Sequence, residues 1–167
     1  MTRCGIGPRF SIAAVLSGIL TGWLTCLYPD RFVIPCIPYW ILAVLGIGLL
    51  VAGTAVYVYS LRIFNRGYRK EQLVIDGPYS VVRHPIYAAW ILLICPGTVL
   101  FFRSWLMLLV PLVAYISFKA YIHKEDDYLK EKFGQTYSNY RSKVNELFPK
   151  WGFWRNNRNT SKECYKT

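Results

Sequence analysis

The chain has 167 residues, a formal net charge of +11 and 54% hydrophobic residues. Its charged residues are bunched between long apolar stretches, whereas a soluble domain of this length would intersperse them, so the composition excludes an ordinary soluble domain and predicts a single membrane domain over residues 1–155. The basic residues form no recognisable nucleic-acid-binding module, and the five cysteines have neither paired spacing nor histidine companions at metal-ligand distances, so we expect no nucleic-acid partner and no bound metal.

Four stretches contain no Asp, Glu, Lys or Arg: 10–29, 32–61, 84–102 and 104–118. A helix needs roughly 20 apolar residues to cross the hydrocarbon core, and the first three stretches reach about that length. The fourth is shorter, so Arg103 and Lys119 at its ends would extend outward to the membrane surface. We predict an all-α integral membrane protein of about four transmembrane helices, at about 10–28, 38–61, 85–102 and 104–122, the last two forming a hairpin.

The basic residues predict the topology. Four spans place the N-terminus, the polar loop 62–83 and the tail from Lys119 on one side of the membrane. That side holds 18 of the 20 Lys and Arg residues, and the other side holds only Arg31 and Arg103. Because positively charged loops stay in the cytoplasm, we predict that both termini are cytoplasmic. Basic loops also favour contact with the anionic head groups of the lipid bilayer.

The cytoplasmic parts carry helix and turn signals of their own. Gly77-Pro78 marks a turn in the polar loop, and His84-Pro85 opens the third span, since proline is favoured at the first helical position. After the fourth span, helices are expected at about 119–133, with Gly134 as the C-cap, and at about 137–147. Residues 156–167 are polar and predicted to form a flexible tail.

The first candidate site is the segment 77–87, which sets Tyr79, Arg83, His84 and Tyr87 at the start of a membrane helix. A helix N-terminus offers N–H groups and partial positive charge to a carboxylate or phosphate. Tyrosine faces can stack on a base or attract a cation. The alternative interpretation is anchoring at the membrane interface, where Tyr and Arg are common.

The second candidate site is the acidic pair Glu125 and Asp126. A helical projection from Ile122 places both carboxylates at the borders of the apolar face that packs inward, while Asp127 points away. A carboxylate in that position needs a partner, because an unpaired buried charge is costly. The alternative to a functional role is an ion pair with an Arg or Lys of the neighbouring loop.

Together the two sites resemble the isoprenylcysteine carboxyl methyltransferase family, and the related membrane phospholipid methyltransferases look similar. The resemblance covers roughly residues 60–150 and rests on Gly-x-Tyr-x-x-x-Arg-His-Pro-x-Tyr, a helical hairpin, and Glu-acid-x-x-Leu-x-x-x-Phe-Gly-x-x-Tyr-x-x-Tyr. The matching positions are Gly77, Tyr79, Arg83, His84, Pro85, Tyr87, Glu125, Asp126, Leu129, Phe133, Gly134, Tyr137 and Tyr140.

The resemblance implies S-adenosylmethionine (SAM) as methyl donor, bound between the polar loop and the tail helices, which would cap the pocket. His84 and Glu125 become candidate catalytic residues, because they are the obvious groups to take a proton from an amine or hydroxyl acceptor, whereas a carboxylate acceptor would need no base. The cofactor-binding residues that the resemblance implies are Gln72, Leu73, Val74, Gly77, Tyr79, Arg83, His84, Pro85, Ile86, Tyr87, Glu125 and Asp126.

Two positions depart from the family pattern. Glu71 stands where the family often has His, two residues before Leu73. Tyr121 stands four residues before Glu125, where some members that methylate prenylcysteine place an Arg for the substrate carboxylate. Tyr121 is the candidate substrate residue. Because it stands in place of that Arg, the sequence does not support prenylcysteine as the substrate, and an amine, hydroxyl or different carboxylate of a lipid is equally open as the acceptor.

The sequence thus predicts a SAM-dependent methyltransferase acting on a lipid-embedded acceptor: an isoprenylcysteine carboxylate, a phospholipid amine or another small lipid. One alternative is an NADPH-dependent membrane sterol or steroid reductase, which has a similar Arg-His-x-x-Tyr neighbourhood but is generally longer. The other is a non-catalytic membrane interaction protein with the same fold. The intact Glu125 beside an intact Arg-His-Pro-x-Tyr argues against that second alternative.

Overall fold

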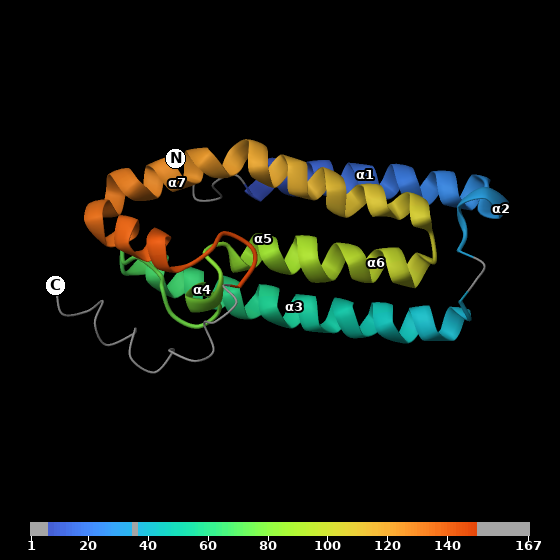
Figure 1. Cartoon of the computed structure of the whole chain (residues 1–167), viewed down its shortest axis with the longest axis horizontal. Coiled ribbons are helices and arrows are strands. Elements are labelled where there is room, and N and C mark those ends of the chain that lie inside the picture. Colours follow the sequence, from blue (N-terminus) through green and yellow to red (C-terminus); the bar gives the residue numbers. More distant parts are fainter. Residues whose placement is uncertain (1–6, 35–36, 150–167) are drawn as a thin grey trace. The chain divides into compact units, whose positions relative to one another are not determined.

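The structure is a computed structural model that describes residues 7–34 and 37–149. All regular secondary structure in these residues is helical, which confirms the predicted all-α class (Figure 1). The predicted tail 156–167 lies outside the described residues. In chain order the helices are α1 (Gly7–Leu27), α2 (Pro29–Phe32), α3 (Tyr39–Arg69), α4 (Pro78–Val81), α5 (Pro85–Ala89), the π-helix η1 (Trp90–Ile94), α6 (Cys95–Phe102), the 3₁₀-helix η2 (Trp105–Leu108) and α7 (Leu109–Lys143).

Three helical stretches are long and apolar enough to cross a membrane: Tyr39–Arg69, Pro85–Phe102 and Trp105–Lys143. They correspond to α3, to α5 with η1 and α6, and to η2 with α7. A further apolar helix, Ile12–Leu27 within α1, is shorter. By length and composition, the described residues therefore contain three helical stretches able to span a membrane, and the count of four spans stays a prediction.

Helix α7 is longer than a membrane is thick. Its 35 residues would extend about 50 Å if straight, at about 1.5 Å per residue, against a hydrocarbon core of about 30 Å. Its charge-free part ends at Phe118. The charged residues that follow, including Asp126, therefore lie beyond the part that can span the membrane.

The chain divides into two compact units. The first combines Met1–Ala55 with Ala89–Glu125, and the second combines Val56–Ala88 with Asp126–Thr167. Helices α3 and α7 each contribute residues to both units. The loop that holds the first candidate site belongs to the second unit.

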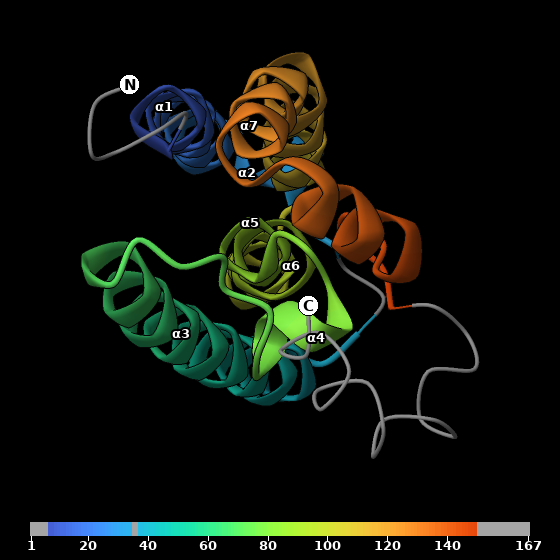
Figure 2. The ribbon, with the colours of Figure 1, turned by 90° about the vertical axis from the view of Figure 1, so that its left-hand side faces the viewer.

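Close packing joins the helices of the first unit in two places. Helix α1 lies beside η2, which leads into α7, and α3 lies beside α6 (Figures 1 and 2). In the first place, the buried hydroxyls of Thr25 and Ser104 hydrogen-bond at 2.7 Å. In the second, a Cβ atom on Gly46 would lie 2.8 Å from Phe101 N and 2.9 Å from Gly97 O. Small residues are the usual means of close helix contact in membranes.

The helix that runs from Pro85 to Phe102 widens into η1 just before Pro96. Proline has no N–H to donate, and its ring would clash with the carbonyl of Leu92, four residues earlier, in a regular α-helix. A π-turn moves that carbonyl aside, and the Cys95 N–H donates to Trp90 O instead. The irregular hydrogen bonding therefore has a local cause in the sequence.

The end of α3, in the second unit, has a backbone motif that was not predicted from the sequence. Gln72 N–H donates to Gly67 O at 3.1 Å and Glu71 N–H donates to Tyr68 O at 3.2 Å, the paired bonds of a Schellman motif. The left-handed residue of this motif, usually glycine, is Glu71 with φ 54°. Glu71 thus ends the helix and turns the chain so that Val74 packs against Gly67. A Cβ atom on Gly67 would overlap Val74 Cγ2.

The two glycines Gly46 and Gly48 provide a matched test of the close packing between α3 and α6. We expect Gly46→Ala to destabilise the protein by about 1–3 kcal/mol, because the added methyl group meets backbone atoms that cannot move away cheaply. Gly48→Ala is the control, since no atom lies within 4 Å of its Cβ position. Thermal unfolding in detergent micelles measures both, and equal unfolding temperatures would contradict the packing described.

Candidate functional site

The loop after α3 reaches the site through a turn that requires glycine. Gly77 has φ 61° and ψ −128°, a conformation that residues with a Cβ atom rarely adopt. A Cβ atom there would also lie 2.8 Å from Ile63 Cδ1. Pro78 follows at the first position of α4. Gly77, which the resemblance implied as a cofactor-binding residue, therefore has a clear backbone role: it starts the helical turn that carries Tyr79.

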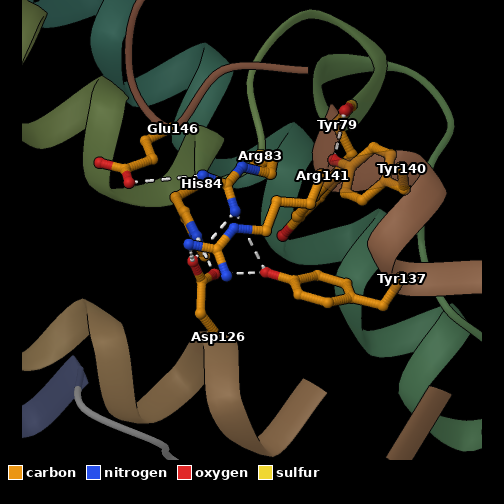
Figure 3. A network of polar contacts seen from close by, with 8 residues as sticks. All are labelled: Tyr79, Arg83, His84, Asp126, Tyr137, Tyr140, Arg141 and Glu146. Atoms are coloured by element: carbon orange, nitrogen blue, oxygen red, sulfur yellow. Dashed lines mark hydrogen bonds and ion pairs between the residues drawn. The ribbon is translucent and has the colours of Figure 1, made fainter. Parts of the chain in front are cut away.

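The Asp126 carboxylate is the centre of a buried network in the second unit (Figure 3). Its Oδ2 atom lies 3.0 Å from Arg83 Nη1 and 3.7 Å from Arg141 Nη2. Its Oδ1 atom lies 3.3 Å from His84 Nε2 and accepts a hydrogen bond from the Tyr137 hydroxyl. Both oxygens of one side chain therefore face donors from the loop and from the end of α7.

The network keeps Asp126 ionised although its side chain is buried. Asp126 is 1% exposed, His84 5% and Arg83 7%. Burial by itself raises the pKa of a carboxyl group, but hydrogen bonds from His84 and Tyr137 and the charge of Arg83 outweigh burial and hold the pKa of Asp126 well below its usual range. Carboxylates at this depth are stable only when they are paired.

The chain after α7 is fastened to the same two loop residues. The backbone N–H of Arg83 donates to Asn145 O at 2.8 Å, and that of His84 donates to Glu146 O at 3.1 Å. Arg83 Nη2 also lies 3.4 Å from Glu146 Oε1. Arg83 is thus paired with two carboxylates, and its backbone and side chain are both fixed.

Two tyrosines from the end of α7 complete the packing. The Tyr140 hydroxyl donates to Tyr79 O at 2.6 Å, which holds α4 in place. Tyr137, Tyr140 and Val144 form a buried cluster, against which pack the partly buried Leu73, Ile75, Leu129 and Phe133. Burial raises the pKa of both tyrosines, so their hydroxyls stay neutral and act as donors.

A sharp bend at Gly134 brings these tyrosines back onto Asp126. Gly134 has φ 53° and ψ −125° inside α7, again a conformation favoured only by glycine. The helix therefore ends and restarts at this point, and Tyr137, eleven residues after Asp126, meets its carboxylate. Gly134 is the predicted cap between two helical parts of α7. The second predicted helix, at about 137–147, was too long, because the helix ends at Lys143.

The structure brings together part of the predicted site. Arg83, His84 and Asp126 are in direct contact, and the rings of His84 and Tyr87 are 6.1 Å apart. For Asp126 the alternative interpretation, an ion pair with an arginine of the neighbouring loop, is observed. The other predicted residues of the second unit differ in burial: Tyr79 and Pro85 are buried, Leu73, Val74 and Ile86 are partly buried, and Gln72 is exposed.

Two predicted residues, Glu125 and Tyr121, belong to the first unit. Both are partly exposed. The approach of Glu125 to the first candidate site and the role of Tyr121 at the substrate stay predictions. Four residues of the network were not predicted as site residues: Tyr137, Tyr140, Arg141 and Glu146. The spacing Gly134-x-x-Tyr137-x-x-Tyr140 was a usable signal for the tyrosines, whereas nothing local to Arg141 or Glu146 indicated their partners.

Comparison with known protein families identifies the chain. The model of the isoprenylcysteine carboxyl methyltransferase (ICMT) family matches residues 39–131, more than half of the sequence. The chain belongs to the ICMT family. This confirms the resemblance, and membership implies a membrane methyltransferase. None of the curated proteins compared with the chain matches it significantly.

The ICMT match includes the Arg83, His84 and Asp126 centre but ends before the bend at Gly134. Tyr137, which donates to Asp126, therefore lies outside the matched range, and the structure supplies its role. Within the described residues, this ICMT family member has no group of three or more His, Cys, Asp or Glu side chains placed to hold a metal ion.

The bend of this ICMT family member can be tested at Gly134 alone. No atom lies within 4 Å of a Cβ atom at Gly134, so Gly134→Ala adds only backbone strain. We expect a loss of about 1–3 kcal/mol of stability, measured by thermal unfolding. Thr136→Ala, two residues on at an exposed position of the same helix, is the control, and equal stability of the two variants would contradict the strained bend.

The central ion pair of the ICMT site has a matched control in the adjacent residue. Asp126→Ala leaves Arg83 buried without its main partner, and we expect it to destabilise the protein by about 3–5 kcal/mol. Asp127→Ala removes the same group from an exposed position and should change stability by no more than about 0.5 kcal/mol. Similar unfolding temperatures for the two variants would show that the carboxylate of Asp126 is not paired as described.

Proposed function

We propose that the protein is a SAM-dependent methyltransferase whose acceptor is a lipid-embedded molecule: an isoprenylcysteine carboxylate, a phospholipid amine or another small lipid. The observation that carries the proposal is the buried contact of Arg83 and His84 with Asp126, which fixes the Arg-His-Pro-x-Tyr motif within a chain of the ICMT family. Apolar membrane helices on the same chain support an acceptor that resides in the bilayer.

The residues around the motif fit SAM in their chemistry. The Arg83 Nε atom is buried and has no hydrogen-bond partner within the described residues, so an acceptor such as the cofactor's carboxylate would satisfy it. The half-buried Leu73 and Val74 and the buried ring of Tyr79 supply an apolar and aromatic wall suited to adenine. The carboxylate of Glu125 suits the ammonium or sulfonium.

In this proposal the cofactor supplies a methyl group activated on a sulfonium, so no metal is required. The protein's contribution is to hold donor and acceptor in line and away from water. Tyr79 and Tyr87 would orient the cofactor, and Glu125 would reach it from α7. For an amine or hydroxyl acceptor, His84 or Glu125 would take the proton, whereas a carboxylate acceptor needs no base.

The same proposal includes the membrane arrangement. Both termini, the loop 62–83 and the end of α7 would lie in the cytoplasm, because that side then carries almost all basic residues. The cofactor would enter from the cytoplasm and the acceptor from the bilayer between helices. Tyr121, on α7 before Glu125, would contact the acceptor and, having no positive charge, would not select for a carboxylate.

Transfer of labelled methyl groups to membrane lipids tests the function. We expect membranes containing the protein to transfer label from SAM to an extractable lipid, and His84→Ala and Glu125→Gln to lower the rate by about 100-fold, since misplaced reacting groups cost that much. Lys124→Gln, an exposed neighbour, should retain the wild-type rate. Label transfer unchanged in His84→Ala and Glu125→Gln would remove both residues from the site.

Ligand binding separates the methyltransferase from the reductase and from a non-catalytic protein. The product S-adenosylhomocysteine should stabilise the purified protein by about 2.7 kcal/mol when present at 100 times its Kd, whereas NADPH should leave the unfolding temperature unchanged. Stabilisation by NADPH alone would identify a reductase. A protein that responds to neither ligand would be a non-catalytic member of the family.

A further inference from the structure

The contact between Asp126 and His84 fixes the chemistry of the histidine ring. The two side chains meet through Asp126 Oδ1 and His84 Nε2 at 3.3 Å, and both are buried. An ionised carboxylate can only accept hydrogen bonds, so the ring nitrogen that faces it must carry the proton. The second ring nitrogen, Nδ1, is then the acceptor in the neutral ring.

We propose that Asp126 is a positioning residue that keeps a proton on His84 Nε2, so that His84 gains or loses a proton only at Nδ1. Its catalytic meaning rests on the proposed methyltransferase function, but the protonation pattern itself does not. This assigns Asp126 an indirect role in place of the cofactor contact that the family resemblance implied.

The geometry around Asp126 favours an indirect role. Its carboxylate accepts hydrogen bonds from Arg83, His84 and Tyr137 and forms an ion pair with Arg141 Nη2 at 3.7 Å. The side chain is only 1% exposed, so partners within the protein itself surround the carboxylate. A cofactor contact would have to displace one of these partners.

Charged side chains of the network lie around Asp126. Arg83 and Arg141 are positive, and Asp126 and Glu146 are negative. The two arginines point to Asp126 and Glu146, and neither can accept a proton from the ring. Asp126 is the acceptor that the ring faces at Nε2.

The fixed tautomer has a defined consequence for an acceptor with an N–H or O–H group. In the transfer, the bond from the acceptor to the methyl carbon forms while the carbon–sulfur bond breaks, and that electron pair stays on sulfur. The acceptor's proton must then leave. His84 Nδ1 is the atom of this ring that can receive it, and the imidazolium so formed is stabilised by Asp126.

Nitrogen-15 NMR of the histidine rings measures the tautomer directly. The chain has two histidines, His84 and His123, so a His123→Gln protein labelled with ¹⁵N-histidine in micelles shows the signals of His84 alone. In the neutral ring we expect Nε2 protonated and Nδ1 unprotonated. A neutral ring protonated at Nδ1, or a mixture of tautomers, would overturn the proposal without any variant of Asp126.

Substitutions then test the cause. Asp126→Asn should abolish the single tautomer, because an amide can either donate to or accept from Nε2. Asp127→Asn should leave the tautomer unchanged, and so should Tyr137→Phe, which removes another donor from Asp126 but not the contact with His84. A fixed Nε2–H tautomer that persists in folded Asp126→Asn would show that Asp126 does not set it.

Kinetics separate this inference from the proposed function. For an amine or hydroxyl acceptor, Asp126→Asn should lower kcat at least about tenfold and change the affinity for S-adenosylhomocysteine by less than about threefold. If kcat and the affinity for S-adenosylhomocysteine both fell in parallel, Asp126 would have a merely structural role, which would contradict the inference. If the wild-type protein shows the Nε2–H tautomer but neither binds S-adenosylhomocysteine nor transfers methyl groups, the proposed function fails while the role of Asp126 stands.

Discussion

The rest of the candidate site depends on one buried carboxylate. Asp126 faces Arg83 and His84 from the loop and Tyr137 and Arg141 from the end of α7. Burying a charge is costly unless it is paired and hydrogen-bonded, so these groups must be in place together for the second unit to be stable. The network thereby fixes the position of the Arg-His-Pro-x-Tyr motif. A methyltransferase of the ICMT family would need such fixed side chains to align donor and acceptor.

Backbone conformation determines which side chains can reach Asp126. The chain turns at Gly77, at Gly134 and, with a left-handed conformation unusual for its residue type, at Glu71. The turns at Glu71 and Gly77 set the direction of the loop, and the turn at Gly134 brings the end of α7 back to Asp126. Gly77 and Gly134 thus have physical roles in the motif independent of any ligand, and the departure from the family pattern at Glu71 falls on a residue that ends α3.

The fold class could be predicted because charge-free stretches of membrane length are visible in the sequence. The contact of Asp126 with a basic residue of the loop could also be predicted, because a helical projection placed Asp126 at the border of a packed face. The contact of Glu146 could not be predicted, because it depends on the path of the chain after Lys143. Tyr137 had a signal in its spacing from Gly134, but its contact with Asp126 depends on the backbone angles at Gly134. The number of spans and the approach of Glu125 to the loop depend on how the helices pack together, which helical periodicity does not predict.

The central claim is that Tyr137 and Asp126 stabilise the protein through one shared interaction. A double-mutant cycle of Asp126→Asn and Tyr137→Phe, measured as free energies of unfolding in mixed micelles, tests it most directly. Residues in contact through a buried hydrogen bond should be energetically coupled. We expect the change in unfolding free energy of the double variant to differ from the sum of the changes in the single variants by at least about 1 kcal/mol. Additivity within about 0.5 kcal/mol, the behaviour of residues that do not interact, would contradict the account.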